Sequence, residues 1–233
     1  MMQAHSKTVY VATTSVEPAW EEEFNRWYDE EHLPNLLQVL GYLSARRYAA
    51  VDGSPPYMAF YEIDSIDAYR GEAHERAVNT PWTARLQPHR TGQLAFYEQV
   101  FPAQGLLPGP VAGEDAAVVG GLLVVRMDVD PAQEADFNAW YNEEHLPALC
   151  GVPGVIGARR FWAIEGGPAY MATYYLTEPA VQASEAWKQA ANTPWSARIR
   201  PAFRNLWRVV YRPLPAAERG AFAAPVTATT PSV

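Results

Sequence analysis

The chain carries the same run of residues twice, and this duplication limits the possible folds more than any other feature. FNRWYDEEHLP at residues 24–34 returns 113 residues later as FNAWYNEEHLP at residues 137–147. Across residues 24–49, 15 of 26 positions match their partners in the second copy. Two copies at so long a period indicate a duplicated domain, because the units of solenoids and propellers are only about 20–50 residues long.

The composition is that of a globular protein without a nucleic-acid or membrane partner. The 18 basic and 26 acidic side chains give a net charge of −8, and no run of Lys or Arg forms a stripe that could neutralise phosphates. No segment resembles a signal peptide or a membrane span, so we expect a cytoplasmic protein. The single cysteine, Cys150, excludes an intrachain disulfide, and its counterpart Leu37 predicts a buried apolar position.

Each copy is expected to contain the element order strand, helix, strand, strand, helix, strand. The signals are β-branched runs, proline at helix starts and turn residues between strands. In the first copy the expected strands are residues 8–13, 41–50, 57–63 and 93–101, and the expected helices begin at 18, 65 and 80. In the second copy the first strand is expected at 121–126 and the last at 206–212.

The start and end of the first helix have specific signals. Pro18 and Pro131 occupy the first helical position, where a missing amide hydrogen costs nothing, and Asp130 is the expected cap in the second copy. The helix is expected to end near His32 or Leu33, because Pro34 disfavours helical geometry in the residue before it. The next helix is expected to run unbroken over residues 65–78.

These elements predict an α+β fold made of two tandem ferredoxin-like βαββαβ repeats. The expected domains are residues 1–105 and 118–214, joined by a linker at 106–117 that is rich in glycine and proline, and followed by a disordered tail at 215–233. A sheet covered by helices on one face needs a cover on the other. We therefore expect the two sheets to pack face to face as an intrachain pseudo-dimeric α+β barrel.

The repeated helix places polar residues beside its apolar stripe. At 100° per residue, Trp20, Phe24 and Trp27 form the stripe and Glu31 falls inside it, whereas Asp29 is expected to point to water. Tyr28 and His32 flank the stripe and can touch each other. The second copy repeats this with Trp140, Glu144, Tyr141 and His145.

Each of these polar residues has a structural interpretation and a functional one. A carboxylate against tryptophan needs a partner, and Arg46 or Arg47 could pair with Glu31, as Arg159 or Arg160 could with Glu144. His32 at a helix end could interact with free carbonyls, or it could be a general base positioned by its Tyr, Glu and Trp neighbours.

Other candidates fall outside this helix. Asn79 and Asn192 precede a capped turn, and Trp82 and Trp195 are expected to wall the space between helices and sheet. His74 and His89 correspond to Trp187 and Ala202, so the comparison of the copies assigns neither to the shared design. One histidine per copy gives no metal site, and no glycine-rich phosphate loop is present.

The W-Y-x-E-E-H-L-P helix, followed by a glycine and an Ala-Arg-Arg strand, resembles the dimeric α+β barrel superfamily, most closely its EthD-like branch. The resemblance covers both copies, residues 8–101 and 121–213. It implies that this chain is a fused dimer. Members of that superfamily include cofactor-free monooxygenases, polyketide cyclases, muconolactone isomerases and haem enzymes. The resemblance implicates His32, His145, Tyr28, Tyr141, Glu31, Glu144 and the neighbouring arginines.

The leading hypothesis is a cofactor-independent isomerase, cyclase or lyase that moves a proton next to a carbonyl of a small, apolar, aromatic or lactone-like metabolite. His32 and His145 would be the bases, Glu31 and Glu144 would orient them, and Tyr28, Tyr141 and an arginine would stabilise the enolate. The expected substrate-binding residues are Arg46, Arg47, Arg159, Arg160, Trp27, Trp140, Asn79, Asn192, Trp82 and Trp195. The rivals are a cofactor-free monooxygenase, a haem protein and a non-catalytic binding or accessory protein. The chain could also pair as a homodimer.

Overall fold

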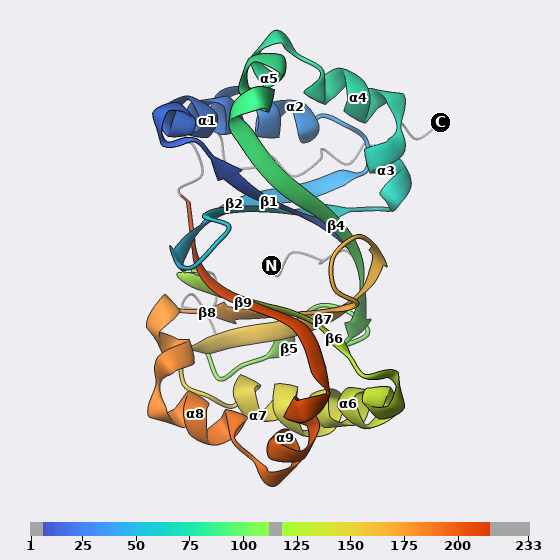
Figure 1. Ribbon diagram of the computed structural model, residues 1–233, viewed down its shortest axis with the longest axis vertical. Coiled ribbons are helices and arrows are strands. Elements are labelled where there is room, and N and C mark those ends of the chain that lie inside the picture. Colours follow the sequence, from blue (N-terminus) through green and yellow to red (C-terminus); the bar gives the residue numbers. More distant parts are fainter. Residues whose placement is uncertain (1–6, 112–117, 215–233) are drawn as a thin grey trace, which may run out of the picture.

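The computed structural model describes residues 7–111 and 118–214, and these form an α+β protein with two similar halves. Figure 1 shows two sheets facing each other across the middle of the molecule, with the helices of each half on the outside. This confirms the predicted fold class. The expected disorder of the tail at 215–233 lies outside the described residues.

The first half follows the predicted order of elements. It consists of β1 (Thr8–Val16), α1 (Glu21–Trp27), the π-helical turn η2 (Tyr28–His32), α2 (Leu33–Leu36), β2 (Tyr42–Asp52), β3 (Tyr57–Ile63), α3 (Ile66–Arg70), α4 (Glu72–Val78), α5 (Pro81–Leu86) and β4 (Arg90–Phe101). Within the expected linker, β5 (Leu107–Pro108) pairs with strand β7 of the second half.

The second half repeats these elements. It consists of β6 (Gly121–Val129), α6 (Glu134–Trp140), the π-helical turn η6 (Tyr141–His145), α7 (Leu146–Cys150), β7 (Val155–Glu165), β8 (Tyr170–Leu176), the 3₁₀ turn η7 (Pro179–Ala183), α8 (Glu185–Ala191), α9 (Pro194–Ile199) and β9 (Phe203–Pro213). Asp130 caps the start of this half's first helical segment, as predicted. Cys150 is buried, also as predicted.

The two sheets join edge to edge into one closed sheet. Its order is β4-β1-β3-β2-β9-β6-β8-β7-β5, and β4 also pairs with β7. The halves are therefore joined twice, by β2 with β9 and by β4 with β7, both antiparallel. Two hydroxyls add to these joints, because Tyr97 donates to the carbonyl of Pro168 and Tyr211 to that of Pro55. Each half thus forms a hydrogen bond to a turn of the other half.

Alternation along the strands divides the core into three parts. One set of alternate side chains, which includes Val9, Val11, Val124 and Val209, fills the barrel interior. The other set packs against the helices of its own half, around Trp27 in the first half and Trp140 in the second. A residue's place along its strand therefore decides whether it can contribute to a site inside the barrel or under the helices.

The predicted end of the first helix is wrong. The chain remains helical past Pro34, through the π-helical turn and then α2. In that turn the amide of Leu33 bonds the carbonyl of Tyr28, five residues back. Pro34 then falls in the first turn of α2, where a proline costs no hydrogen bond. The second half repeats the arrangement over η6 and α7.

The prediction of one helix over residues 65–78 is also wrong, because the chain is extended at Gly71 and separates α3 from α4. Ser65 caps α3 through the amide of Asp67. In the second half the corresponding break lies at Ser184, between η7 and α8.

Candidate active site

The repeated carboxylate binds a threonine rather than an arginine. Thr80 at the start of α5 donates its hydroxyl to Glu31 at 2.6 Å, which corrects the expected pairing with Arg46 or Arg47. The same threonine caps α5 through the amide of Thr83. The Thr83 hydroxyl in turn accepts from Trp27 Nε1 at 3.2 Å. This network joins the end of the first helix to α5.

The second half contains the same network. Thr193 donates to Glu144 at 2.5 Å, and Trp140 Nε1 donates to the hydroxyl of Ser196 at 3.2 Å. Thr193 also caps α9 through the amide of Ser196. Since both halves use these residues to fasten one helix to another, the repeated Trp, Glu and Thr positions have a clear structural role.

Removal of the Thr80 hydroxyl tests that role. Thr80→Val is expected to destabilise the protein by about 2–3 kcal/mol, because it removes both a helix cap and a hydrogen bond to a carboxylate. Thr80→Ser keeps the hydroxyl and is expected to stay within about 1 kcal/mol of the wild type. Urea unfolding measures both variants. Equal stabilities for the two would contradict the network.

The paired arginines face opposite sides of the sheet. Arg47 lies on the helix side, where it bonds Asp29 at 3.0 Å and the side chain of Asn25 at 2.5 Å. Asp29 was expected to point to water, so that prediction is wrong. The Arg47 guanidinium also lies 4.3 Å from the ring centre of Tyr28. Arg46, one residue earlier, is exposed.

In the second half, Arg160 repeats the helix-side arrangement. It bonds the side chains of Asn142 at 2.5 Å and Asn138 at 2.9 Å, and lies 4.2 Å from the ring centre of Tyr141. Arg159 instead enters the barrel and pairs across the two halves with Glu62 at 2.6 Å. Neither arginine pairs with Glu144.

The two predicted bases, His32 and His145, lie against aromatic rings and keep part of their surface exposed. His32 stacks on Trp27 at 4.2 Å, and His145 stacks on Trp140 at 4.1 Å. Burial lowers the pKa of each imidazole from 6.5 to about 3, helped at His32 by nearby positive groups, of which Arg90 has the largest effect. Both rings are therefore neutral at pH 7, and His145 Nδ1 has no hydrogen-bond partner.

The structure brings a third histidine into the first half, one that the comparison of the two copies had set aside. His74 on α4 lies with its Nδ1 2.7 Å from the hydroxyl of Tyr42 on β2. Burial lowers the pKa of His74 and raises that of Tyr42. The two residues keep 8% and 7% of their surface exposed, so the pair lies just beneath the surface. Tyr69 stands 4.3 Å from the His74 ring.

A cluster of tyrosines connects this pair to the predicted site. Tyr10 stacks on Tyr61 at 4.1 Å and meets Tyr42 edge-on at 6.1 Å. The Tyr61 hydroxyl is buried without a partner. Burial raises the pKa of Tyr61 well above its ordinary value, and nearby Tyr28 raises it further. The space under the first half's helices therefore holds phenols and imidazoles side by side.

The second half lacks this cluster. At the positions equivalent to Tyr10, Tyr42, Tyr69 and His74 it has Leu123, Val155, Gln182 and Trp187. Tyr174, the counterpart of Tyr61, meets Trp187 edge-on at 5.3 Å instead. The two halves thus share a scaffold, but the hydrogen-bonded pair of Tyr42 and His74 occurs in the first half.

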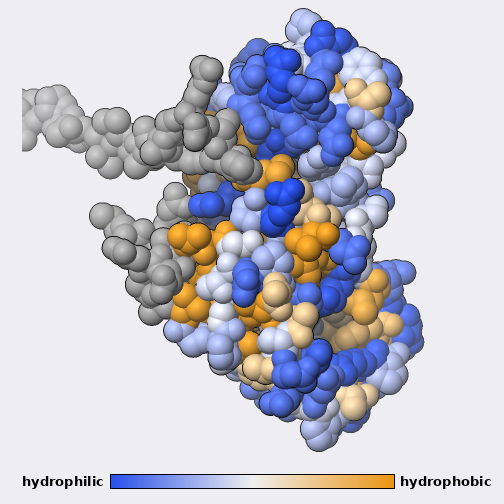
Figure 2. Space-filling view, turned by 90° about the vertical axis from the view of Figure 1, so that its left-hand side faces the viewer, coloured by the Kyte–Doolittle hydropathy of each residue, from blue (hydrophilic) through white to orange (hydrophobic). Residues whose placement is uncertain are grey.

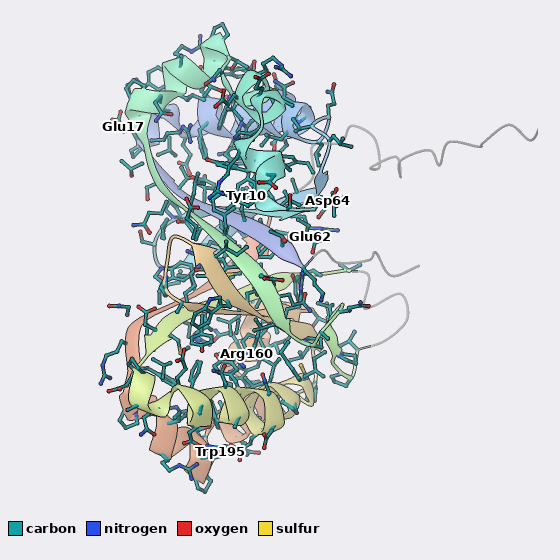
Figure 3. All side chains as sticks on the ribbon, turned by 90° about the vertical axis from the view of Figure 1, so that its right-hand side faces the viewer. Tyr10, Glu17, Glu62, Asp64, Arg160 and Trp195 are labelled. Atoms are coloured by element: carbon teal, nitrogen blue, oxygen red, sulfur yellow. The ribbon has the colours of Figure 1, made fainter. Side chains whose placement is uncertain are left out.

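The remaining predicted residues are partly or fully exposed, and Trp82 and Trp195 pack against the edge of the core of their halves. Trp82 Nε1 donates to Glu23 at 3.1 Å, and Trp195 Nε1 donates to Asp136 at 3.0 Å. Figure 3 shows Trp195 at the outer end of its half, away from the sheets. Asn192 accepts from Arg200 at 2.8 Å on the surface, and Asn79 is exposed at the end of α4.

A groove of about 560 Å³ is lined by residues of both halves. Its walls come from 51–53 at the end of β2, from Glu178 and η7, and from 208–210 in β9, and none of its lining residues is a predicted site residue. Figure 2 shows apolar residues exposed on one side of the molecule at the level where the halves meet and below it.

Two kinds of feature are missing from the described part of the chain. Among residues 7–111 and 118–214, no group of three or more His, Cys, Asp or Glu side chains is arranged to hold a metal ion. None of the described helices combines the length and apolarity needed to cross a membrane.

Comparison with known proteins identifies the fold. No known family profile and no curated protein matches the sequence. Among solved structures, an anthrone oxidase-like protein is 16% identical with a TM-score of 0.60, covering 93% of this chain and 96% of its own. A candidate monooxygenase from Lactobacillus acidophilus NCFM is 9% identical with a TM-score of 0.55, covering 88% and 93%.

An arginine-to-glutamate variant of the chlorite dismutase from Candidatus Nitrospira defluvii is 12% identical with a TM-score of 0.63, covering 90% of this chain and 92% of its own. All three likenesses extend over nearly the whole of both chains. At these identities they show the fold alone. The chain has the fold of the dimeric α+β barrel proteins, with both halves of the barrel in one polypeptide.

Proposed function

We propose that the chain is a cofactor-independent enzyme that moves protons at a small, largely apolar aromatic or lactone-like metabolite, in an isomerase, cyclase or lyase reaction. The observation that carries this proposal is the pairing of His74 Nδ1 with the Tyr42 hydroxyl at 2.7 Å inside an aromatic cluster. A neutral imidazole and a phenol held together can serve as base and acid at a ketone.

The tautomer of His74 decides which group is the base and which is the acid. When Nδ1–H donates to the oxygen of Tyr42, Nε2 is left unprotonated and the phenol hydrogen is free to point at a substrate. Nε2 then takes a proton from carbon next to a carbonyl, while Tyr42 donates to the carbonyl oxygen as it becomes an enolate. Return of the proton to another position completes an isomerisation. The low pKa of His74 keeps it ready to accept.

His32 and Tyr28 extend the proposed site. His74 is among the groups that lower the pKa of His32, so the two imidazoles lie close enough to affect each other. With its pKa at about 3, neutral His32 serves as a hydrogen-bonding partner for the substrate and as a base only toward an acidic carbon. The second half keeps His145 but replaces His74 with Trp187, so we assign turnover to the first half.

A cofactor-free monooxygenase is the second candidate, and the fold neighbours described as anthrone oxidase-like and as a candidate monooxygenase favour it. The same enolate, once formed, reacts with dioxygen as the oxidant. One methylene group and one O₂ give one ketone and one water, and the substrate supplies all four electrons. The two candidates therefore share their first step and differ in what reacts with the enolate.

Haem does not fit the spaces under the helices. In the second half the rings under the helices are closely packed, since Phe137, Trp140, Tyr141 and Tyr174 are each at most 2% exposed. In the first half Phe24, Trp27 and Tyr61 are fully buried. A tetrapyrrole would have to displace these residues. No step of the proposed reaction involves haem.

Anthrone, an aromatic ketone with an acidic methylene, is a suitable probe for both candidates. Under nitrogen in D₂O, the protein is expected to speed deuterium exchange at that methylene, which mass spectrometry follows. In air, oxygen uptake with conversion of that methylene to a second carbonyl, which gives the quinone, would identify the monooxygenase. Tyr42→Phe is expected to slow either reaction about 10²–10⁴-fold, because it removes the acid.

The non-catalytic alternative predicts a different pattern. Binding of anthrone without exchange or oxygen uptake, both in the wild type and in Tyr42→Phe, would support a binding or accessory protein. Equal rates in the wild type and in Tyr42→Phe would remove the proposed pair from the reaction.

A further inference from the structure

Arg126 is a buried cation inside the barrel, on the opposite face of the sheet from the proposed active site. It lies on β6, where its Cα partners are Met171 on β8 and Trp207 on β9. Only 5% of its surface is exposed. The barrel face of β6 is otherwise apolar nearby, with fully buried Leu122 and Val124.

The guanidinium of Arg126 has no anionic partner among the described residues. Its Nε and Nη2 are buried without any hydrogen-bond acceptor. Its neighbours are the rings of Trp207 at 4.8 Å and Tyr97 at 5.8 Å. Asp128, two residues along β6, is already bonded to the amide of Ala169 and to Asn205.

Arg159, another arginine on the barrel face of the sheet, shows how such a charge is normally accommodated. Arg159 bonds Glu62 and Gln99, both at 2.6 Å. The position equivalent to Arg126 in the first half is Thr13, so the barrel architecture does not itself require a cation there. A buried charge without a counter-ion strongly destabilises the folded state, and a bound anion is the simplest compensation.

A second unsatisfied donor faces the same interior. The hydroxyl of Thr173 is buried without a partner, and Thr173 lies two residues from Met171 on the same face of β8. Met171, directly opposite Arg126, has an unbranched side chain that can rearrange around a ligand. The hydroxyls of Tyr97 and Tyr211 are directed to proline carbonyls, so neither supplies a negative charge.

We propose that Arg126 is the anchor of an anion-binding site inside the barrel, which takes the carboxylate of a small organic acid. The planar guanidinium matches a carboxylate with two parallel hydrogen bonds. The rings of Trp207 and Tyr97 supply apolar surface for the body of the acid. The site is independent of the proposed reaction, because it lies on the other face of the sheet.

Thermal unfolding of the full chain in benzoate, acetate, phosphate and chloride at equal ionic strength tests this proposal. Benzoate or acetate is expected to raise the melting temperature saturably above the value in chloride, because a ligand of the folded state stabilises it. Phosphate reports whether the site accepts any oxyanion rather than carboxylates alone. Isothermal titration calorimetry of the same anions gives the stoichiometry, expected to be one per chain.

Arg126→Met is expected to lose the rise in melting temperature that carboxylates cause. In chloride this variant is expected to melt at or above the wild-type temperature, because the substitution removes an unpaired buried charge. Arg126→Lys keeps the charge without the fork and is expected to bind about tenfold more weakly. Arg46→Met, which removes an exposed arginine, is the matched control and should respond like the wild type. The proposal would be overturned if carboxylates still raised the melting temperature of Arg126→Met, or if they did not raise that of the wild type.

Discussion

Lowering the pH from 7 to 4 is expected to cost the protein several kcal/mol of stability. Burial holds the pKa of His32 and of His145 at about 3 in the folded state, whereas both titrate near 6.5 in the unfolded chain. The unfolded state therefore binds more protons than the folded state between these values. The stabilisation is complete above pH 6.5 and is lost as the pH falls toward 3.

The expected size of this loss follows from linkage. One pH unit within the window costs a single group about 1.4 kcal/mol. At pH 4 this amounts to about 3 kcal/mol for each histidine, and the two together approach the whole stability of a typical domain, about 5–15 kcal/mol. Urea unfolding at a series of pH values measures how steeply the free energy of unfolding falls with pH.

Variants separate the two histidines from the other titrating groups. His32→Gln and His145→Gln should each reduce the change in unfolding free energy between pH 7 and pH 4 by about half. This holds whatever stability each variant loses at pH 7 from lost stacking. His89→Gln is the control, since His89 lies near the surface beside Glu17. A wild-type stability at pH 4 within about 1 kcal/mol of that at pH 7 would contradict the lowered pKa values of the two imidazoles.

Glu62→Leu is expected to destabilise the barrel by about 3–5 kcal/mol, because it takes the carboxylate away from a fully buried arginine. Arg159 has no exposed surface, and its bond to Glu62 crosses from one half to the other. The double variant Glu62→Leu with Arg159→Met removes both charges and should recover most of the loss. Equilibrium unfolding in urea measures all of these variants.

A surface pair between the same two halves is the matched control. Arg70 and Glu165 are both more than half exposed and bond at 2.5 Å. Glu165→Leu is therefore expected to cost less than about 1 kcal/mol. Equal losses for Glu62→Leu and Glu165→Leu would show that burial of the Arg159 pair contributes nothing to the joining of the halves.

Much of the fold could be predicted from the sequence. The spacing of the repeat and the alternation of apolar residues together predict two βαββαβ halves that cover each other, because burial imposes those patterns. The errors came from local rules. The rule against a helix before Pro34 assumes α-helical geometry, and a π-helical turn removes the conflict. The break at Gly71 depends on how α3 and α4 pack on the sheet, which no local pattern records.

The candidate site was harder to predict, and the duplication explains why. Residues kept in both copies include those that join helices in both halves, such as Glu31 with Thr80. Comparing the copies therefore selected the scaffold and discarded His74. The same comparison gives no signal at Arg126, because its counterpart in the first copy is Thr13. The differences between the copies were the better signal, but only the structure shows which of them meet in space.

Deuterium exchange of anthrone under nitrogen, compared between the wild type and His74→Gln, tests the central claim most directly. Glutamine keeps the size and polarity of the side chain but cannot act as a base. The exchange rate is expected to fall about 10²–10⁴-fold in His74→Gln and to remain unchanged in His89→Gln. An exchange rate in folded His74→Gln within about threefold of the wild type would contradict the assignment of proton transfer to Tyr42 and His74.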